Sequence, residues 1–149
     1  MIPTGLLAKL SGEPAETLNA LVRETRRIER AAMEAVMAYE RSLGFVPRDV
    51  SAEKCGYDVE SQVIGTGKLR FIEVKGRVAG AETVTLTKNE ILTALNKPSE
   101  FILAIVEVDG ELIGTPRYII RPFTREPDFG ATSVTYALRE LLNRAEVVA

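Results

Sequence analysis

Residues 69–75 are Leu-Arg-Phe-Ile-Glu-Val-Lys, a run of β-forming side chains that predicts a strand. Side chains alternate between the two faces of a strand, so the odd-numbered residues of this run share one face. That face begins apolar, with Leu69 and Phe71, and ends charged, with Glu73 and Lys75. The pattern predicts a strand that is buried at its start and carries two charged groups at its carboxyl end. Ligand sites of open α/β sheets lie at that end.

The segments around this strand are typical of an α/β domain. Helices are expected at 15–43 (one long or two successive), at 88–96 and after Ser133, strands at 45–50, 57–63, 69–74, 83–86, 101–108, 111–113 and 117–121, and a loop at 76–82. Thr87 and Glu90 match a capping box at the start of the second helix. Phe101 to Val108 has the continuous apolar pattern of a central strand, and Asp109-Gly110 predicts a hairpin after it.

The predicted core is therefore helix, three strands, helix, strand, with a mixed sheet, helices on both faces, an added hairpin and a C-terminal helix. The length of 149 residues suits one domain. Residues 1–14, with two glycines and two prolines, are expected to be a lead-in, and residues 15–149 to form the domain.

Composition excludes several classes of chemistry. The chain has no histidine, which rules out Ser-His-Asp and Cys-His catalysis and most zinc sites. Cys55 is the only cysteine, so no internal disulfide forms, which suits a reducing compartment and a cytoplasmic location. No apolar run approaches the roughly 20 residues of a membrane span, and no membrane association is expected.

The net charge of −2 means that any contact with DNA must come from local basic patches. Three candidate patches are Arg23, Arg26, Arg27 and Arg30; Lys75 and Arg77; and Arg117, Arg121 and Arg125. For each patch taken alone, a solvated face without a nucleic-acid contact is the favoured interpretation.

Asp58 is placed to complete a site with Glu73 and Lys75. If the turn at Gly65-Thr66-Gly67 makes an antiparallel pair, Asp58 meets them across the ladder. Two close carboxylates repel one another unless a proton or a cation lies between them. Mg²⁺ (or Mn²⁺) takes oxygen ligands, which Asp58, Glu73 and the carbonyl of Val74 can supply, and Lys75 can then orient the attacking water. The alternative is a solvent-facing ion pair of Glu73 and Lys75 without function.

The stretches GYDVES (56–61), LRFIEVKGR (69–77) and TVTLTKNEILTAL (83–95) together resemble the PD-(D/E)XK (restriction-endonuclease-like) nuclease superfamily. More closely they resemble the NO VEIN C-terminal-type domain, found at the end of Swi/Snf-type helicases. The resemblance spans roughly residues 26–108. It implies a restriction-endonuclease-like core and the hydrolysis of DNA with Asp58 and Glu73 as metal ligands and Lys75 as the lysine.

The resemblance also implies a further glutamate on the first helix. Glu34 has the expected spacing of ten residues to Gly44, whereas Glu40 flanks the apolar stripe of the helix, and both stay candidates. The residues expected to contact nucleic acid are Arg77, Lys88, Asn89 and Arg117.

The function implied is that of a Mg²⁺-dependent nuclease domain, accessory to a DNA helicase or to a defence or restriction system. Two alternatives stay open: a catalytically silent binding module of the same fold, and a structural domain with a surface salt network. The expected partners are DNA and, as open alternatives, a helicase in the same polypeptide and a second copy of the chain as a homodimer.

Overall fold

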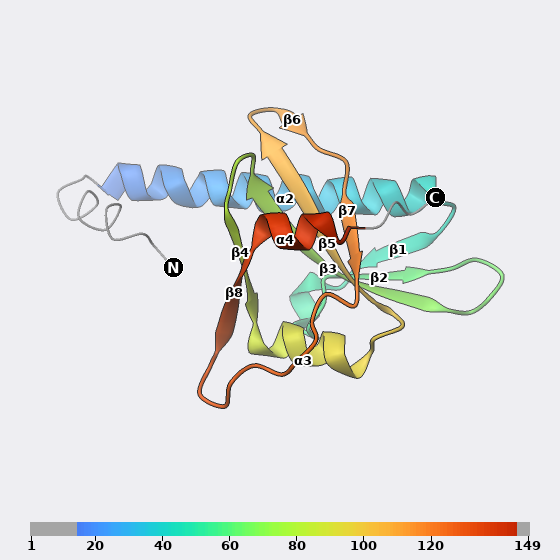
Figure 1. The fold of residues 1–149 in the computed structure, drawn as a ribbon. Helices are drawn as coiled ribbons and strands as arrows, with labels where there is room; N and C mark the ends of the chain where they lie inside the picture. Colours follow the sequence, from blue (N-terminus) through green and yellow to red (C-terminus); the bar gives the residue numbers. More distant parts are fainter. Residues whose placement is uncertain (1–14, 146–149) are drawn as a thin grey trace.

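The structure is a computed structural model that describes residues 15–145 (Figure 1). In chain order its elements are α2 (Ala15–Ser42), β1 (Val46–Asp49), η1 (Ser51–Glu53), β2 (Val59–Gln62), β3 (Leu69–Val78), β4 (Thr83–Thr87), α3 (Lys88–Asn96), β5 (Phe101–Asp109), β6 (Leu112–Ile113), β7 (Arg117–Ile120), β8 (Ser133–Ala137) and α4 (Leu138–Asn143). The predicted lead-in, residues 1–14, and the final residues, 146–149, lie outside the described residues.

A mixed sheet forms the centre of the molecule. Its strand order is β1-β2-β3-β5-β6, and β7 also pairs with β5. β3 and β5 run parallel, while β1–β2, β2–β3, β5–β6 and β5–β7 are antiparallel. The mixed sheet, the central position of residues 101–108 and the hairpin at Asp109-Gly110 are confirmed. β1 lies at the edge, where Pro47 costs no ladder hydrogen bond.

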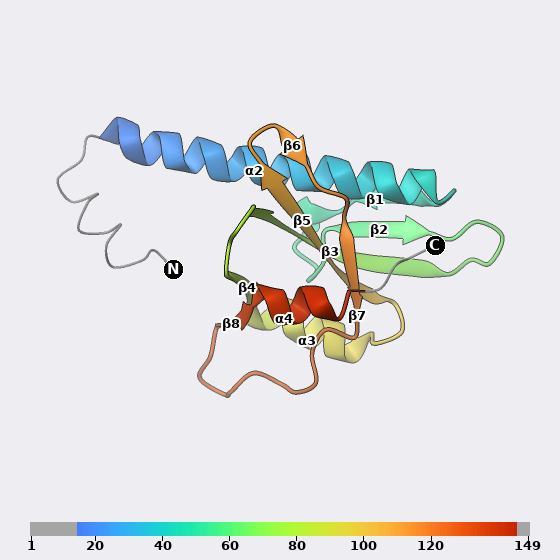
Figure 2. The same ribbon diagram turned by 45° about the horizontal axis from the view of Figure 1, so that its top comes forward.

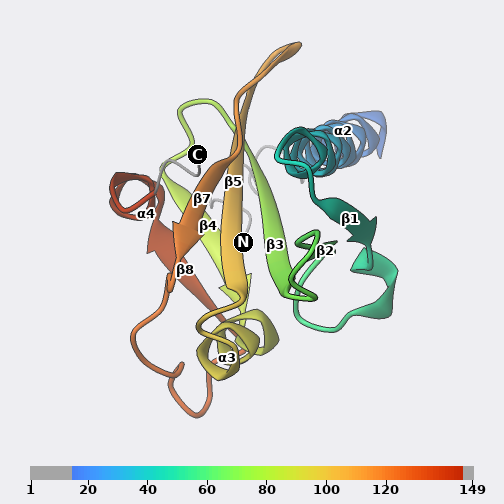
Figure 3. The ribbon, with the colours of Figure 1, turned by 90° about the vertical axis from the view of Figure 1, so that its right-hand side faces the viewer.

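The two faces of the sheet are covered by different helices (Figure 3). Along β5, Ile102, Ala104 and Val106 face α2, where they form one core cluster with Ala32 and Val36. The intervening residues, such as Leu103 and Ile105, face α3, α4 and the strands β4 and β8, and belong to a second cluster. The unbroken apolar run of β5 follows from this burial on both faces.

Gly76 sets how closely α2 approaches the sheet. A Cβ atom at this position would lie 2.9 Å from the Cβ of Ala32 and 2.9 Å from the carbonyl oxygen of Ile28. Only a residue without a side chain allows that approach. The glycine therefore lies inside β3, which continues to Val78, and the predicted loop at 76–82 is shorter than expected.

A buried ion pair fixes the C-terminal half of α2. Arg70 donates to both carboxylate oxygens of Glu40, at 3.0 and 3.1 Å, and the Tyr118 hydroxyl donates to Glu40 at 2.8 Å. The Glu40 side chain is fully buried. A buried charge of this kind is tolerated because its oxygens all have donors.

The C-terminal segment differs from the prediction. The expectation that Ser133 caps a helix is wrong, because residues 133–137 form β8, which pairs antiparallel with β4 in a separate two-stranded sheet. Its β-branched and aromatic residues alternate in burial, and helix α4 begins only at Leu138. β4 pairs with β8 and not with the main sheet, so three strands of the main sheet precede α3 and β4 is a fourth strand outside it.

Helix α2 is continuous, which decides between the one-helix and two-helix alternatives. Its first turns extend beyond the edge of the sheet (Figure 2). Within residues 15–145, no helix combines the length and the apolar character needed to cross a lipid bilayer.

Candidate active site

Asp58 immediately precedes β2 and is held by the backbone on both sides. Its N–H donates to the carbonyl of Ile72 at 2.9 Å, and its carbonyl accepts from the N–H of Val50 at 2.8 Å. One carboxylate oxygen, Oδ2, accepts from the N–H of Val74 at 3.0 Å. The last paired residues of β2 and β3 are Val59 and Ile72. The Asp58 side chain therefore points at the part of β3 that β2 leaves uncovered.

Glu73 and Lys75 lie on the face of β3 that is turned toward α3. Glu73 is only 3% exposed, and Lys75 Nζ lies 3.7 Å from its Oε1. Both residues pair in register with apolar residues of β5, Leu103 and Ile105. The two side chains lie together as predicted, but the expectation that they end the strand is wrong, because β3 continues to Val78 and places them in its middle.

Glu90 brings a third carboxylate to the same place. It completes the predicted capping box, because its Oε1 accepts from the N–H of Thr87 at 2.8 Å and its own N–H donates to Thr87 Oγ1 at 3.2 Å. The same carboxylate lies 3.1 Å from Lys75 Nζ. Glu90 thus stabilises the start of α3 and also fixes the Lys75 ammonium group.

The three carboxyl groups strongly affect one another. Burial, the Asp58 charge and hydrogen bonding with Glu90 raise the pKa of Glu73 to about 11, against the opposing influence of Lys75. Burial also raises the pKa of Asp58, although the Val74 N–H and Glu73 act to lower it. Burial acts to raise the pKa of Glu90, but hydrogen bonding with Glu73 and the Lys75 charge outweigh it and lower that pKa. At neutral pH Glu73 therefore carries a proton, while the lowered pKa of Glu90 keeps that neighbour anionic.

These groups lie in a cleft of about 570 Å³, which we call the carboxylate cleft. It is defined by Asp58, Glu73, Val74, Lys75 and Glu90 together with Arg26, Glu29 and Arg30 of α2. The floor is acidic, and two guanidinium groups from the helix form part of the wall.

The helix glutamate in the cleft is Glu29, which the sequence analysis missed. Glu34 is exposed and lines a hollow beside Ile113, on the other flank of α2. Glu40 is paired with Arg70 on the opposite face of the sheet from Glu73. Neither predicted glutamate therefore reaches the cleft. Spacing to Gly44 does not report the register of α2 on β3, which the contact at Gly76 sets.

Of the four residues predicted to contact nucleic acid, Arg77 and Asn89 line hollows that share residues with the carboxylate cleft. Arg77 donates to the carbonyl of Thr83 at 2.9 Å and lines a groove of about 410 Å³ that shares Lys75 with the carboxylate cleft. Asn89 lines a hollow of about 200 Å³ together with Asp58 and Glu73.

The other two predicted contact residues are engaged elsewhere. Lys88 donates to the carbonyl of Phe129 at 3.3 Å, and Arg117 donates to that of Leu142 at 3.1 Å. The structure brings neither of them into the carboxylate cleft.

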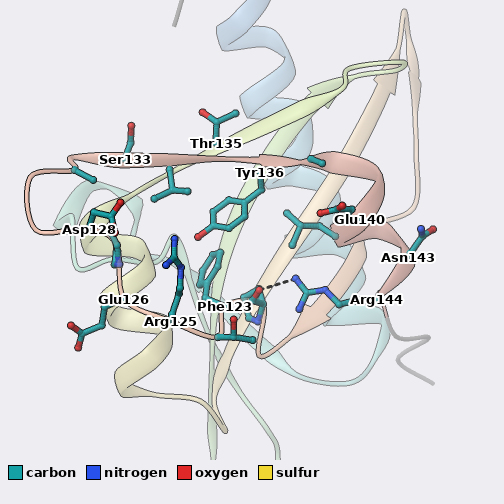
Figure 4. Close-up of a pocket in the computed structure, with 17 residues that line it drawn as sticks. Phe123, Arg125, Glu126, Asp128, Ser133, Thr135, Tyr136, Glu140, Asn143 and Arg144 are labelled. Carbon is teal, nitrogen blue, oxygen red and sulfur yellow. Dashed lines mark hydrogen bonds between the residues drawn. The ribbon is translucent and has the colours of Figure 1, made fainter.

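A larger cavity of about 800 Å³ lies in the C-terminal part of the chain, away from these carboxylates (Figure 4). Its wall includes the rings of Phe123 and Tyr136, 5.2 Å apart, and Arg144, which donates to the carbonyl of Pro122 at 2.8 Å. Size alone does not identify a reaction centre. The smaller cleft is the better candidate because it gathers buried carboxyl groups with shifted pKa values around one ammonium group.

The cleft offers oxygen ligands for a divalent cation. The N–H and C=O of one strand residue point to the same side, so the Val74 carbonyl faces the Asp58 side, where β2 no longer pairs. No three acidic or cysteine side chains among residues 15–145 are arranged as ligands of one ion. The available set is thus two carboxylates, one carbonyl and water, which suits Mg²⁺, an ion that usually keeps several waters.

Comparison with known proteins gives one match. Residues 28–119, more than half of the chain, match the family model described as Protein NO VEIN, C-terminal. The matched segment runs from α2 to β7 and contains all the residues that define the carboxylate cleft except Arg26. No curated protein matches the chain.

Proposed function

The chain belongs to the NO VEIN C-terminal family, and we propose that it is a Mg²⁺-dependent nuclease domain of the PD-(D/E)XK type that hydrolyses DNA phosphodiester bonds. The wider context proposed is that of an accessory domain of a DNA helicase or of a defence or restriction system.

One observation carries the proposal: three carboxyl groups converge on one lysine in a cleft, and the most buried of them holds a proton at neutral pH. Such a cluster is costly in the free protein, because like charges repel and burial penalises the ionised form. A divalent cation can replace the proton and relieve both costs. Strong shifts of this kind cluster at functional sites.

Asp58, Glu73 and the Val74 carbonyl are the groups proposed to hold the ion. When bound there, Mg²⁺ would acidify a water and stabilise the negative charge that develops on the phosphate. Asp58 is positioned for this role because the Val74 N–H donates to its Oδ2 and so fixes the orientation of the carboxylate.

Lys75 is the group proposed to act on the attacking water or on the developing charge. Its ammonium is held 3.1 Å from Glu90 and 3.7 Å from Glu73, so it remains at the mouth of the carboxylate pair. With a side-chain exposure of 22%, it can still meet a substrate that enters the cleft.

A second candidate is a catalytically silent module of the same fold that binds nucleic acid or a partner. The net charge of −2 favours it, because a domain that finds DNA unaided usually has a basic excess. Lys75 acts in the reaction in the first candidate and has no catalytic role in the second, so a variant at this position distinguishes the two functions.

The test measures nicking of supercoiled plasmid with Mg²⁺ or Mn²⁺, and DNA affinity in EDTA, for the wild type and Lys75→Ala. We expect metal-dependent nicking by the wild type. The variant should nick at least 100-fold more slowly with little change in affinity, because a group that acts mainly in the transition state affects turnover more than binding. Lys68→Ala, at an exposed lysine of the β2–β3 turn, is the control and should behave as the wild type.

Binding without metal-dependent nicking would favour the silent module. Nicking that Lys75→Ala leaves unchanged would remove the catalytic assignment, and an equal fall in rate and affinity would make Lys75 a phosphate-binding residue.

A further inference from the structure

Three arginines of α2 have no partner among the residues that the structure describes. Arg23, Arg26 and Arg30 are exposed, and within residues 15–145 none of them forms an ion pair or a hydrogen bond. Their neighbour Arg27 differs, because it pairs with Glu24 at 2.6 Å and donates to the carbonyl of Gly110 at 3.0 Å. A guanidinium group without a partner is available to a ligand.

Helical spacing puts the three arginines on one flank of α2. Positions 23, 26 and 30 follow the i, i+3, i+7 pattern, which lines up side chains along one side of a helix. Arg26 and Arg30 line the carboxylate cleft, and Arg23 lies one turn further toward the N-terminus. Seven residues of helix span about 10 Å, which is the length of the row, and the step from Arg26 to Arg23 extends the cleft wall by about 4.5 Å of that length.

The hollowed surface continues in the same direction. The groove that contains Arg77 shares Glu29, Lys75 and Gly76 with the carboxylate cleft and is lined further along by Thr25 of α2. A chain-like ligand can therefore enter beside α2 and still reach Lys75, whereas a compact ligand needs only the cleft itself.

We propose that Arg23, Arg26 and Arg30 form a phosphate-binding row that holds the sugar–phosphate backbone of a polynucleotide on one side of the carboxylate cleft. The inference rests on the proposed function for the class of ligand. It adds the direction in which the polynucleotide leaves the cleft. It also assigns binding of the phosphates to the arginine row and hydrolysis to the carboxyl groups of the cleft.

Spacing supports this ligand class. Successive phosphates of one duplex strand advance about 3.4 Å along the helix axis, so the row matches the length of about three phosphates. Guanidinium groups bind phosphate oxygens in a bidentate manner, and arginine is the side chain preferred for that contact.

The experiment compares two triple variants of the whole chain that lose the same charge. One carries Arg23→Gln, Arg26→Gln and Arg30→Gln, and the control carries Arg41→Gln, Lys68→Gln and Arg139→Gln, three exposed basic residues outside the cleft. Binding to a 20-base-pair duplex and to a single strand of the same length is measured in EDTA over a range of salt concentrations.

For the row variant we expect weaker binding and a salt dependence that is shallower by about 0.9 for each lost phosphate contact on duplex, or about 2.7 in total. The single strand decides which form the row prefers, because its slope per contact is about 0.7. The control variant should keep the slope of the wild type.

Equal slopes for the row variant and the control, or no binding of either nucleic acid by the wild type, would overturn the inference. Nicking is scored separately, so a chain that binds through the row but never cuts would refute the nuclease proposal and leave the arginine row intact.

Discussion

At the scale of single residues, Glu73 is the group whose state the fold controls most. It is an almost fully buried carboxylic acid in the middle of β3, with Asp58 and Glu90 as neighbours. Its raised pKa means that the native protein binds a proton that the unfolded chain releases above about pH 4.3. Folding and proton binding are therefore linked at this position.

The sign of this linkage gives a prediction. The native state holds more protons than the unfolded state between about pH 4.3 and about pH 11, so this contribution to stability is complete at low pH and is lost as the pH rises. In EDTA, the melting temperature of Glu73→Gln minus that of the wild type should increase from pH 5 to pH 9, because glutamine imitates the protonated acid at every pH. The difference can grow by at most about 1.4 kcal/mol per pH unit.

Thermal unfolding at five or six pH values checks this prediction. Parallel melting curves for the two proteins would show that Glu73 is ionised in the native state. Arg139→Gln, on the exposed side of α4, controls for a change of charge without a change of burial.

The residues of the site could be predicted from the sequence only where the local pattern fixes their direction. The alternation of residues 69–75 and the glycine turn after β2 bring Asp58, Glu73 and Lys75 together. The cleft residues of α2 could not be predicted in this way, because the side of a helix that faces a strand depends on their register. That register depends on the contact between Gly76 and α2, which joins segments more than 40 residues apart.

At the scale of elements, the docking of α2 on β3 positions the arginine wall over the carboxylate floor. Gly76 permits the close approach, and the Glu40–Arg70 pair fixes the other end of the helix. The two contacts act as a pair of anchors along an antiparallel helix and strand.

Gly76→Ala is predicted to loosen this docking. The new methyl group would lie 2.9 Å from the backbone carbonyl of Ile28, which cannot rotate away, so α2 must shift. Overpacking of this kind costs about 1–3 kcal/mol. Gly130→Ala is the matched control, because its Cβ would meet nothing within 4 Å.

Urea unfolding of the two glycine variants checks the difference. We expect a lower midpoint for Gly76→Ala only, and any nuclease activity should fall with it because Arg26 and Arg30 move with the helix. Equal midpoints would mean that the helix shifts without cost.

Strand β8 shows why some elements could not be predicted. The sequence Ser-Val-Thr-Tyr-Ala, followed by Leu-Arg-Glu-Leu-Leu, suits a helix that starts at Ser133, since serine is a good N-cap. The edge of β4 needs a partner, and pairing with residues 133–137 supplies it. A tertiary requirement of this kind overrides local propensity.

At the scale of the whole molecule, the hydrophobic core extends to residues beyond the end of the family match. The match ends at residue 119, but the cluster beneath β4 and β5 also contains Phe123, Leu138, Leu141 and Leu142. The C-terminal segment is therefore part of the core and not an appendage.

A chain that ends at Ile120 is predicted not to fold cooperatively. Loss of four buried side chains removes about 6–12 kcal/mol of apolar burial, at 1.5–3 kcal/mol each, which is comparable with the whole stability of a domain. A chain that starts at Thr25 is the control, since it loses only exposed turns of α2. Circular dichroism during heating should show a sigmoidal transition for the control alone, and a sharp transition in the shorter chain would assign the core to residues 15–120.

The pairing of β4 with β8 also has a consequence for folding during translation. Every side chain of the carboxylate cleft is made by residue 90, yet β4, which leads directly into α3, lacks its partner strand until residue 137 has been added. A nascent chain therefore carries the acidic groups before it can hold Glu90 in place. The cleft can therefore be complete only after β8 has been translated and pairs with a segment made some fifty residues earlier.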